Sequence, residues 1–218
     1  IMRRAHEGHT NTCIGGGDEV HPGPVGHTLM AAIILERLHA PALVSSVAFD
    51  VSDASAPTLV NAAQCSVSNI TLTDGILSFD RADECLPMPV DARATGALAL
   101  APVQDRLNRY MLKADGLTDG RYDLWIDGEW VTTACREEWA GGWNLATTAG
   151  PITRQAREVL ALIFKKNRVE LTLWEASLRA WRKAELPGLE QQVEALEAQI
   201  AAACQPKVHR FELRPIER

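Results

Sequence analysis

The stretch LNRYMLKADGLTDGRYDLWIDGEWV, residues 107–131, contains two runs in which apolar and polar residues alternate. Tyr110–Ala114 is the first run and Tyr122–Ile126 the second. Alternation with a period of two is typical of strands that bury one face. Asp127 and Gly128 follow the second run, and this dipeptide is a strong signal for a two-residue hairpin turn. The stretch therefore predicts antiparallel β-structure.

Further short β-prone runs lie on both sides of this stretch, separated by turn residues. They are Leu43–Val51, Ile70–Leu72, Ile76–Phe79 and Trp130–Thr132. Together they predict a small antiparallel β-module over residues 42–148.

Helical periodicity flanks this β-module. Before it, Val25–Leu38 has apolar residues at the spacing of a helix with one buried face. After Pro151 the apolar period becomes helical again, with a break at Pro187-Gly188 and a possible last strand over Val208–Leu213. We therefore expect an α+β fold in which residues 149–218 form a helical hairpin with a terminal strand.

Composition excludes several classes of function. The chain has 218 residues, is 46% hydrophobic and has a formal charge of −6, with 28 acidic and 22 basic residues. No concentrated positive charge is present to hold phosphates, so nucleic acid is not an expected partner. No apolar run reaches the roughly 18–20 residues that a membrane span needs. The five cysteines are widely spaced and form no C-x-x-C pair, which argues against a disulfide framework or a thiolate zinc site.

The segment GGGDEVHPGPVGH, residues 15–27, is the main chemical motif. Asp18 lies three residues before His21, so its carboxylate can reach the Nδ1–H of that ring in a tight turn and stabilise the imidazolium that forms when Nε2 accepts a proton. Three glycines precede Asp18 and give the backbone conformational freedom there, and Pro22 favours an extended conformation of His21. The alternative is a helix-capping turn with a solvated histidine. His27, in the first turn of the expected helix, is interpreted as structural.

The residues just before this segment include three further side chains of the types that bind metals. His6, His9 and Cys13 carry ligand atoms near His21, but no fourth ligand stands at a regular spacing. The sequence therefore predicts an ordinary loop here, with no metal and no cofactor.

The stretch DEVHPGPVGHTLMAAIILERL resembles the last conserved block of the SGNH (GDSL-type) hydrolases, D-G-V-H-P-N-x-x-G-H-x-x-M-A. The block is matched at Asp18, His21, Pro22, Gly26, His27, Met30 and Ala31, and it differs at Glu19 and Gly23. Residues 107–131 and 140–146 look like the β-rich C-terminal extension of bacterial proteins of this type. The resemblance implies that Asp18 and His21 belong to a catalytic triad with a serine.

The nucleophile block of that family, G-D-S, is absent from this sequence. Isoleucine at position 1 is not a natural initiator, so we expect residues 1–41 to be the C-terminal end of an SGNH hydrolase domain. The resemblance then implies a serine ester hydrolase that acts on a small-molecule or carbohydrate ester, with carbohydrate O-acetyl esters as common family substrates. Without the upstream serine and oxyanion-hole residues, the 218-residue chain is expected to be inactive.

Two non-catalytic functions remain as alternatives. Trp125, Trp130, Trp139 and Trp143 could stack on sugar rings in a carbohydrate-binding module, although packing within the β-module is the stronger interpretation. Asn144 is interpreted as a capping or turn residue. Helices over 151–186 and 188–204 could join subunits through an apolar stripe, or that stripe could pack against the rest of the protein.

Overall fold

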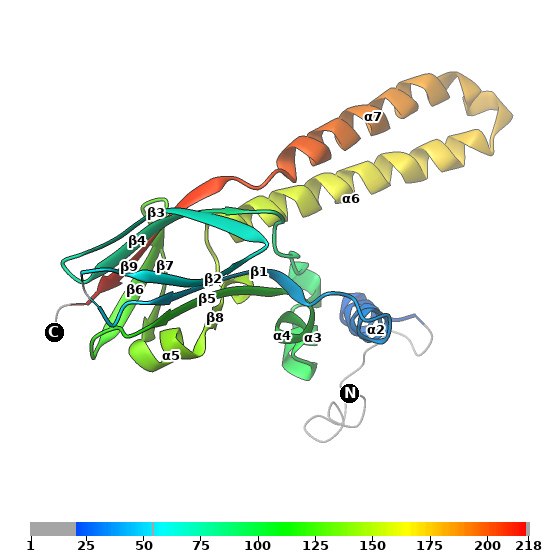
Figure 1. The fold of residues 1–218 in the computed structure, drawn as a ribbon. Coiled ribbons are helices and arrows are strands. Elements are labelled where there is room, and N and C mark those ends of the chain that lie inside the picture. The colour runs from blue at the N-terminus through cyan, green and yellow to red at the C-terminus, as the bar shows by residue number, and fades with distance from the viewer. Residues whose placement is uncertain (1–20, 54, 217–218) are drawn as a thin grey trace.

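A computed structural model describes residues 21–53 and 55–216. The chain folds into an α+β structure in which two β-sheets pack face to face and a long helical hairpin projects away from them (Figure 1). Asp18, His6, His9 and Cys13 lie outside the described residues.

The first sheet has the strand order β2-β1-β5-β8. Its strands are β1 (Leu43–Asp50), β2 (Thr58–Ala63), β5 (Arg109–Asp115) and β8 (Trp143–Asn144). The second sheet has the order β3-β4-β9-β6-β7. Its strands are β3 (Cys65–Thr73), β4 (Ile76–Asp83), β6 (Arg121–Ile126), β7 (Glu129–Cys135) and β9 (Val208–Pro215).

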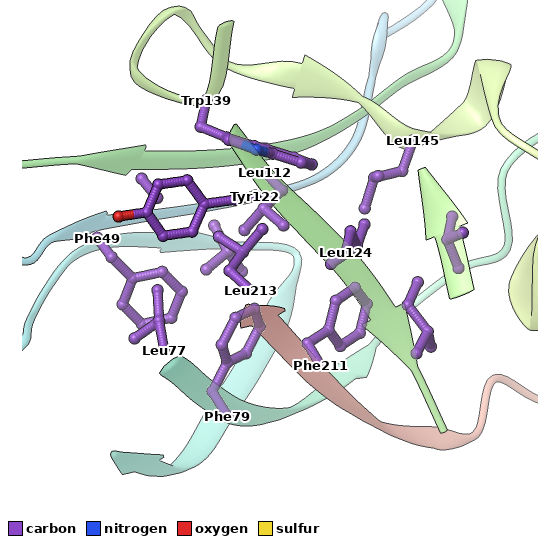
Figure 2. Packing of buried hydrophobic residues seen from close by; sticks show 14 of the residues in the cluster. Phe49, Leu77, Phe79, Leu112, Tyr122, Leu124, Trp139, Leu145, Phe211 and Leu213 are labelled. Atoms are coloured by element: carbon purple, nitrogen blue, oxygen red, sulfur yellow. The ribbon is translucent and has the colours of Figure 1, made fainter. Parts of the chain in front are cut away.

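The core lies between the two sheets. Alternation places Val47 and Phe49 of β1 and Leu112 of β5 on the inner face of one sheet, and all three are buried. From the other sheet, Phe79 stacks on Phe211 with ring centres 5.1 Å apart. All five side chains belong to one buried cluster, in which Figure 2 labels Phe49, Phe79, Leu112 and Phe211. Apolar burial of this kind is the main term that favours folding.

The expectation of a purely antiparallel module is wrong at one pairing. β1 and β5 run parallel, with Val47 opposite Leu112, while the other pairings among the described strands are antiparallel. Parallel neighbours need a long connection. Here the connection contains β2, the strands β3 and β4 of the second sheet, and three short helical segments. These segments are η1 (Ala92–Ala94), α3 (Gly96–Leu100) and α4 (Val103–Leu107).

The turn expected at Asp127-Gly128 is confirmed. β6 and β7 pair on either side of it, and both turn residues have positive φ, 53° and 77°, as a type I′ turn requires. Residues 116–120 make a different connection, since they carry the chain from the first sheet to the second. The terminal strand expected over Val208–Leu213 is β9, which lies between β4 and β6. The second sheet therefore uses residues from both sides of position 149.

Two helical units complete the fold. α2 (Pro24–Arg37) packs on η1, α3 and α4 at one end of the sandwich. α6 (Pro151–Ser177), the 3-10 segment η3 (Ala180–Glu185) and α7 (Leu186–Ala203) form the projecting hairpin. Two shorter segments, α5 (Arg136–Gly141) and η2 (Leu145–Thr147), flank β8. Within the described ranges, no helix has the length and apolar character needed to cross a membrane.

Candidate functional site at the start of α2

α2 begins where the sequence motif ends. Pro24 occupies the first helical position, where its missing N–H has no intrahelical partner to lose, and Gly23 is the extended N-cap. The His27 N–H donates to the Gly23 carbonyl at 2.9 Å and closes the first turn. The helix therefore gives the residues before it a fixed point of attachment.

His21 lies three residues before the helix and its side chain is exposed. Asp18, its expected partner, is outside the described residues, so the Asp18–His21 pairing stays a prediction. His21 therefore lies outside α2, on the exposed segment that leads into it.

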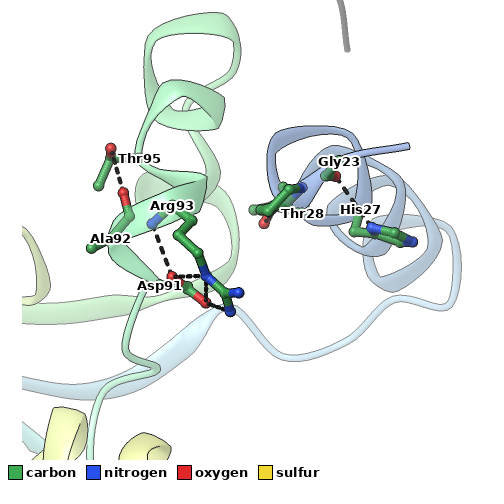
Figure 3. A network of polar contacts seen from close by, with 8 residues as sticks. Gly23, His27, Thr28, Asp91, Ala92, Arg93 and Thr95 are labelled. Atoms are coloured by element: carbon green, nitrogen blue, oxygen red, sulfur yellow. Dashed lines mark hydrogen bonds and ion pairs between the residues drawn. The ribbon is translucent and has the colours of Figure 1, made fainter. Parts of the chain in front are cut away.

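His27 has the structural role that the sequence suggested. Its Nδ1 lies 3.2 Å from the Gly23 carbonyl oxygen, one turn earlier on the same helix (Figure 3). Thr28 donates through its hydroxyl to the Pro24 carbonyl at 2.9 Å. Both side chains are thus engaged with the backbone of the first turn of α2.

An apolar groove of about 200 Å³ runs beside α2. One wall is formed by α2, with Thr28, Ala31, Ala32 and Leu35, and Leu160 of α6 contributes from the hairpin. The remaining lining residues come from the segment before η1 and from α4: Met88, Pro89, Val90, Asp91, Val103 and Leu107. The lining is almost entirely apolar, so the groove suits a hydrocarbon or aromatic group rather than a charged one.

The rim of this groove carries one charged pair. Asp91 accepts a hydrogen bond from the Arg93 backbone N–H at 2.9 Å and forms an ion pair with the Arg93 guanidinium at 2.5 Å (Figure 3). The side-chain hydrogen bond from Arg93 lowers the pKa of the Asp91 carboxyl. The pair therefore stays ionised at neutral pH and caps η1, which fixes one side of the groove.

The outer face of α2 is apolar and uncovered. Gly26, Leu29 and Ala32 are buried against the neighbouring helices. On the other side, apolar residues are between 44% and 73% exposed, namely Met30, Ile33, Ile34 and Leu38. An exposed apolar patch of this kind is typical of a surface that contacts another folded unit.

The tryptophan-rich segment does not form one open platform. Trp139 is fully buried and contacts Trp143, with ring centres 5.6 Å apart. Trp125 and Trp130 are cross-strand neighbours on the outer face of the second sheet. The guanidinium of Arg214 lies 4.6 Å from the Trp125 ring centre and covers that ring.

Asn144 is a structural residue, as the sequence suggested. Its Oδ1 accepts from the Tyr110 N–H at 3.0 Å and from the Ala146 N–H at 3.2 Å. The side chain thus joins β8 to β5 and caps η2, which leaves no free amide group directed at a ligand.

Sequence reasoning missed a buried polar network between the sheets. Arg81 and Asp83 of β4 form an ion pair of 2.8 Å, and their side chains are 0% and 4% exposed. The hydroxyls of Ser45 and Tyr110 both donate to the Asp83 carboxylate. The sequence did contain a signal for this. Arg81 lies two residues after Phe79 and four after Leu77, so on a strand its side chain points to the same buried face as theirs.

Within residues 21–53 and 55–216, no set of three or more His, Cys, Asp or Glu side chains comes together in a way that could hold a metal ion.

Comparison with known proteins places this fold. No family model matches the chain, and no curated protein matches it. Among solved structures, the chain is similar to a gut microbial diltiazem-metabolizing enzyme, with a TM-score of 0.83 and 21% sequence identity. The similarity covers 98% of this chain and 59% of that chain, so this chain spans less than two thirds of its structural relative. The α+β fold described above is therefore one that also occurs in an enzyme.

Proposed function

We propose that the chain is the C-terminal portion of an SGNH/GDSL-type serine ester hydrolase. In this proposal residues 1–41 end the catalytic domain, residues 42–148 contribute most of the β-rich accessory module, and residues 149–218 add the hairpin and the strand β9. The position of His21 carries the proposal, because it lies three residues before α2, whose outer face is apolar and exposed. That arrangement suits a histidine that completes a site on an adjoining domain.

The roles of the two motif residues follow from acyl-transfer chemistry. A serine from the catalytic domain attacks the ester carbonyl while His21 Nε2 takes its proton, and His21 then returns the proton to the departing alcohol. Water then attacks the acyl-enzyme while His21 takes its proton; the bond between the acyl carbon and the serine oxygen breaks, His21 returns the proton to that oxygen, and the carboxylic acid is released. Asp18 holds the ring in the tautomer that leaves Nε2 free to accept.

The apolar groove beside α2 supports an ester with a hydrocarbon or aromatic part. Carbohydrate O-acetyl esters are the substrate class suggested by the family resemblance. Diltiazem, the compound that the structurally similar enzyme metabolizes, is a second substrate to test.

Fluorophosphonate labelling of a longer protein that includes the upstream serine tests the proposal. We expect labelling at a serine and hydrolysis of an activated ester by that protein, and neither by the 218-residue chain. In the longer protein, His21→Ala should lower kcat by a factor on the order of 10⁶, and Asp18→Asn by roughly 10⁴.

His27→Gln is the matched control, because His27 belongs to the same motif but bonds the backbone of α2. It should keep most of the activity. Equal losses in the His21 and His27 variants would argue for a structural role of the whole segment. His21-dependent hydrolysis by the 218-residue chain alone would contradict the need for an upstream serine.

A further inference from the structure

The helix α6 has two faces, and only one of them meets α7. Lys166 pairs with Glu197 of α7 at 3.4 Å, and the Gln155 amide donates to the carbonyl of Ala203, the last residue of α7. At 3.6 residues per turn, Gln155 and Lys166 stand about 180° and 200° around the helix from Phe164. The side of α6 that carries Phe164 therefore faces away from α7.

That outward side carries a regular apolar row, which we name the outer stripe of α6: Phe164, Asn167, Leu171, Trp174 and Leu178. Its apolar members are between 41% and 67% exposed. The spacing along the row is 3-4-3-4, the pattern by which one helix packs against another in a coiled coil, and Asn167 is the single polar position in it. A row of this regularity is suited to a second helix.

We infer that the outer stripe is the contact surface for a second copy of this chain, with the two α6 helices packed antiparallel around a two-fold axis. The axis would pass between Leu171 and Trp174, so that Leu171 of each copy meets Trp174 of the other. A two-fold contact of this kind is self-complementary and closes at a dimer.

Charge complementarity favours the antiparallel arrangement. Arg168 and Glu175 flank the stripe on the same side, both are exposed, and neither forms an ion pair with another residue that the structure describes. Antiparallel packing places Arg168 of each copy beside Glu175 of the other. Parallel packing would instead bring Glu170 of one copy toward Glu175 of the other, and like charges at these flanking positions repel.

The surface beside the stripe has room for the partner's hairpin tip. A groove of about 480 Å³ is lined by Arg93, Phe164, Asn167, Arg168 and Leu171. In the antiparallel arrangement, Leu178 of the second copy lies opposite Asn167, and the hairpin tip that follows it, which includes Trp181 of η3, extends toward Phe164. Trp181 is 75% exposed at the tip of the hairpin, so this contact would cover a side chain that the single chain leaves in water.

A lipid surface is the other occupant to consider, since tryptophan and arginine are common at membrane interfaces. A helix that lies on an anionic lipid surface typically carries lysine and arginine along its polar face. The outer stripe runs for about 21 Å along α6, at 1.5 Å per residue, and its flanks carry Glu170 and Glu175 as well as Arg168. The distribution therefore favours a helix as the partner.

Sedimentation velocity of the 218-residue chain over a wide concentration series tests the inference. We expect a species of twice the 23.8 kDa chain mass that dissociates on dilution. The variant Leu171→Gln/Trp174→Gln should raise the dimer dissociation constant at least about a hundredfold, because both residues sit at the centre of the contact. Val60→Gln/Trp130→Gln is the matched control, since it removes two exposed apolar side chains from the sandwich.

A charge exchange tests the antiparallel register. Arg168→Glu and Glu175→Arg should each weaken the dimer several-fold, and the combined variant should restore it, a rescue that loss of folding would not produce. A chain that stays monomeric at all concentrations overturns the inference, as does a dimer that the stripe variant leaves unchanged. Binding of the monomer to phosphatidylserine vesicles through Leu171 and Trp174 would overturn it in favour of a lipid surface.

Discussion

The guanidinium of Arg81, on the second sheet, lies 4.1 Å from the ring centre of Tyr110, on the first. The same guanidinium donates to Asp83 at 2.8 Å and to the Ser45 hydroxyl at 2.6 Å. Two sheets that otherwise meet through apolar side chains are thus joined by one buried, hydrogen-bonded charge pair.

Arg81→Met should destabilise the chain strongly. The substitution keeps much of the apolar length but leaves the Asp83 carboxylate buried without its cation, which typically costs about 3–5 kcal/mol. Urea unfolding at neutral pH measures this loss. Arg154→Met removes an exposed ion pair with Glu129 and should cost less than about 1 kcal/mol. Equal costs for the two variants would contradict the importance of the buried pair.

Tyr110 should make stability depend on alkaline pH. Burial raises the pKa of its phenol well above the usual range; the Asp83 carboxylate adds to this shift, while Arg81 opposes it. An unfolded tyrosine loses its proton near pH 10, about its unperturbed pKa, whereas the folded chain keeps it. The contribution of the Tyr110 proton to the free energy of unfolding is therefore fully present below about pH 10 and is lost as the pH rises further.

Tyr110→Phe removes that titration. The variant should be less stable at neutral pH, because Asp83 loses a donor, but it should lose less stability than the parent chain above about pH 10. Unfolding free energies measured across this range check the expectation. Parallel alkaline losses in both proteins would assign the pH dependence to other groups.

Gly116 and Gly128 allow the cost of a positive φ to be measured separately from the cost of a steric clash. Their φ angles, +79° and +77°, are nearly the same, so an alanine pays a similar left-handed penalty of about 1–2 kcal/mol at either position. At Gly128 a Cβ would meet nothing within 4 Å, but at Gly116 it would overlap the backbone nitrogen of Ser52. Gly116→Ala should therefore be the more destabilising, by about 1–3 kcal/mol in thermal or urea unfolding.

Ile34→Gln tests whether the outer face of α2 meets another domain. In the 218-residue chain Ile34 is 54% exposed, so the change should alter stability by no more than about 0.5 kcal/mol. In a longer protein whose catalytic domain covers this face, the same change should cost about 1.5–3 kcal/mol. Val60→Gln, on the exposed surface of β2, is the control and should have a small effect on stability in both proteins. If Ile34→Gln also has only a small effect in the longer protein, no other domain covers the outer face of α2 there.

Local signals predicted the local structure well. The hairpin at Asp127-Gly128 was predictable because a type I′ turn requires residues that tolerate positive φ. α2 was predictable from its apolar spacing and its early proline, Pro24. Both features depend on neighbours within a few residues.

Long-range pairings were not predictable in the same way. Nothing near β9 in the sequence indicates that it lies between β4 and β6, and nothing near β1 indicates a parallel partner in β5. The candidate site was partly predictable, because His21 and its helix form one continuous segment. The Arg81 network was not, since its members come from three strands and meet only when the two sheets pack.

The central place of β9 has a consequence for synthesis. A ribosome releases β3, β4, β6 and β7 first, yet the five-stranded sheet lacks its middle strand until β9 has also left the exit tunnel. The nascent β4 and β6 must wait with unpaired edges while the whole helical hairpin is made, and such edges are prone to intermolecular pairing. Termination of translation after the hairpin would thus remove the central strand of the sheet and leave β3-β4 and β6-β7 as two separate strand pairs.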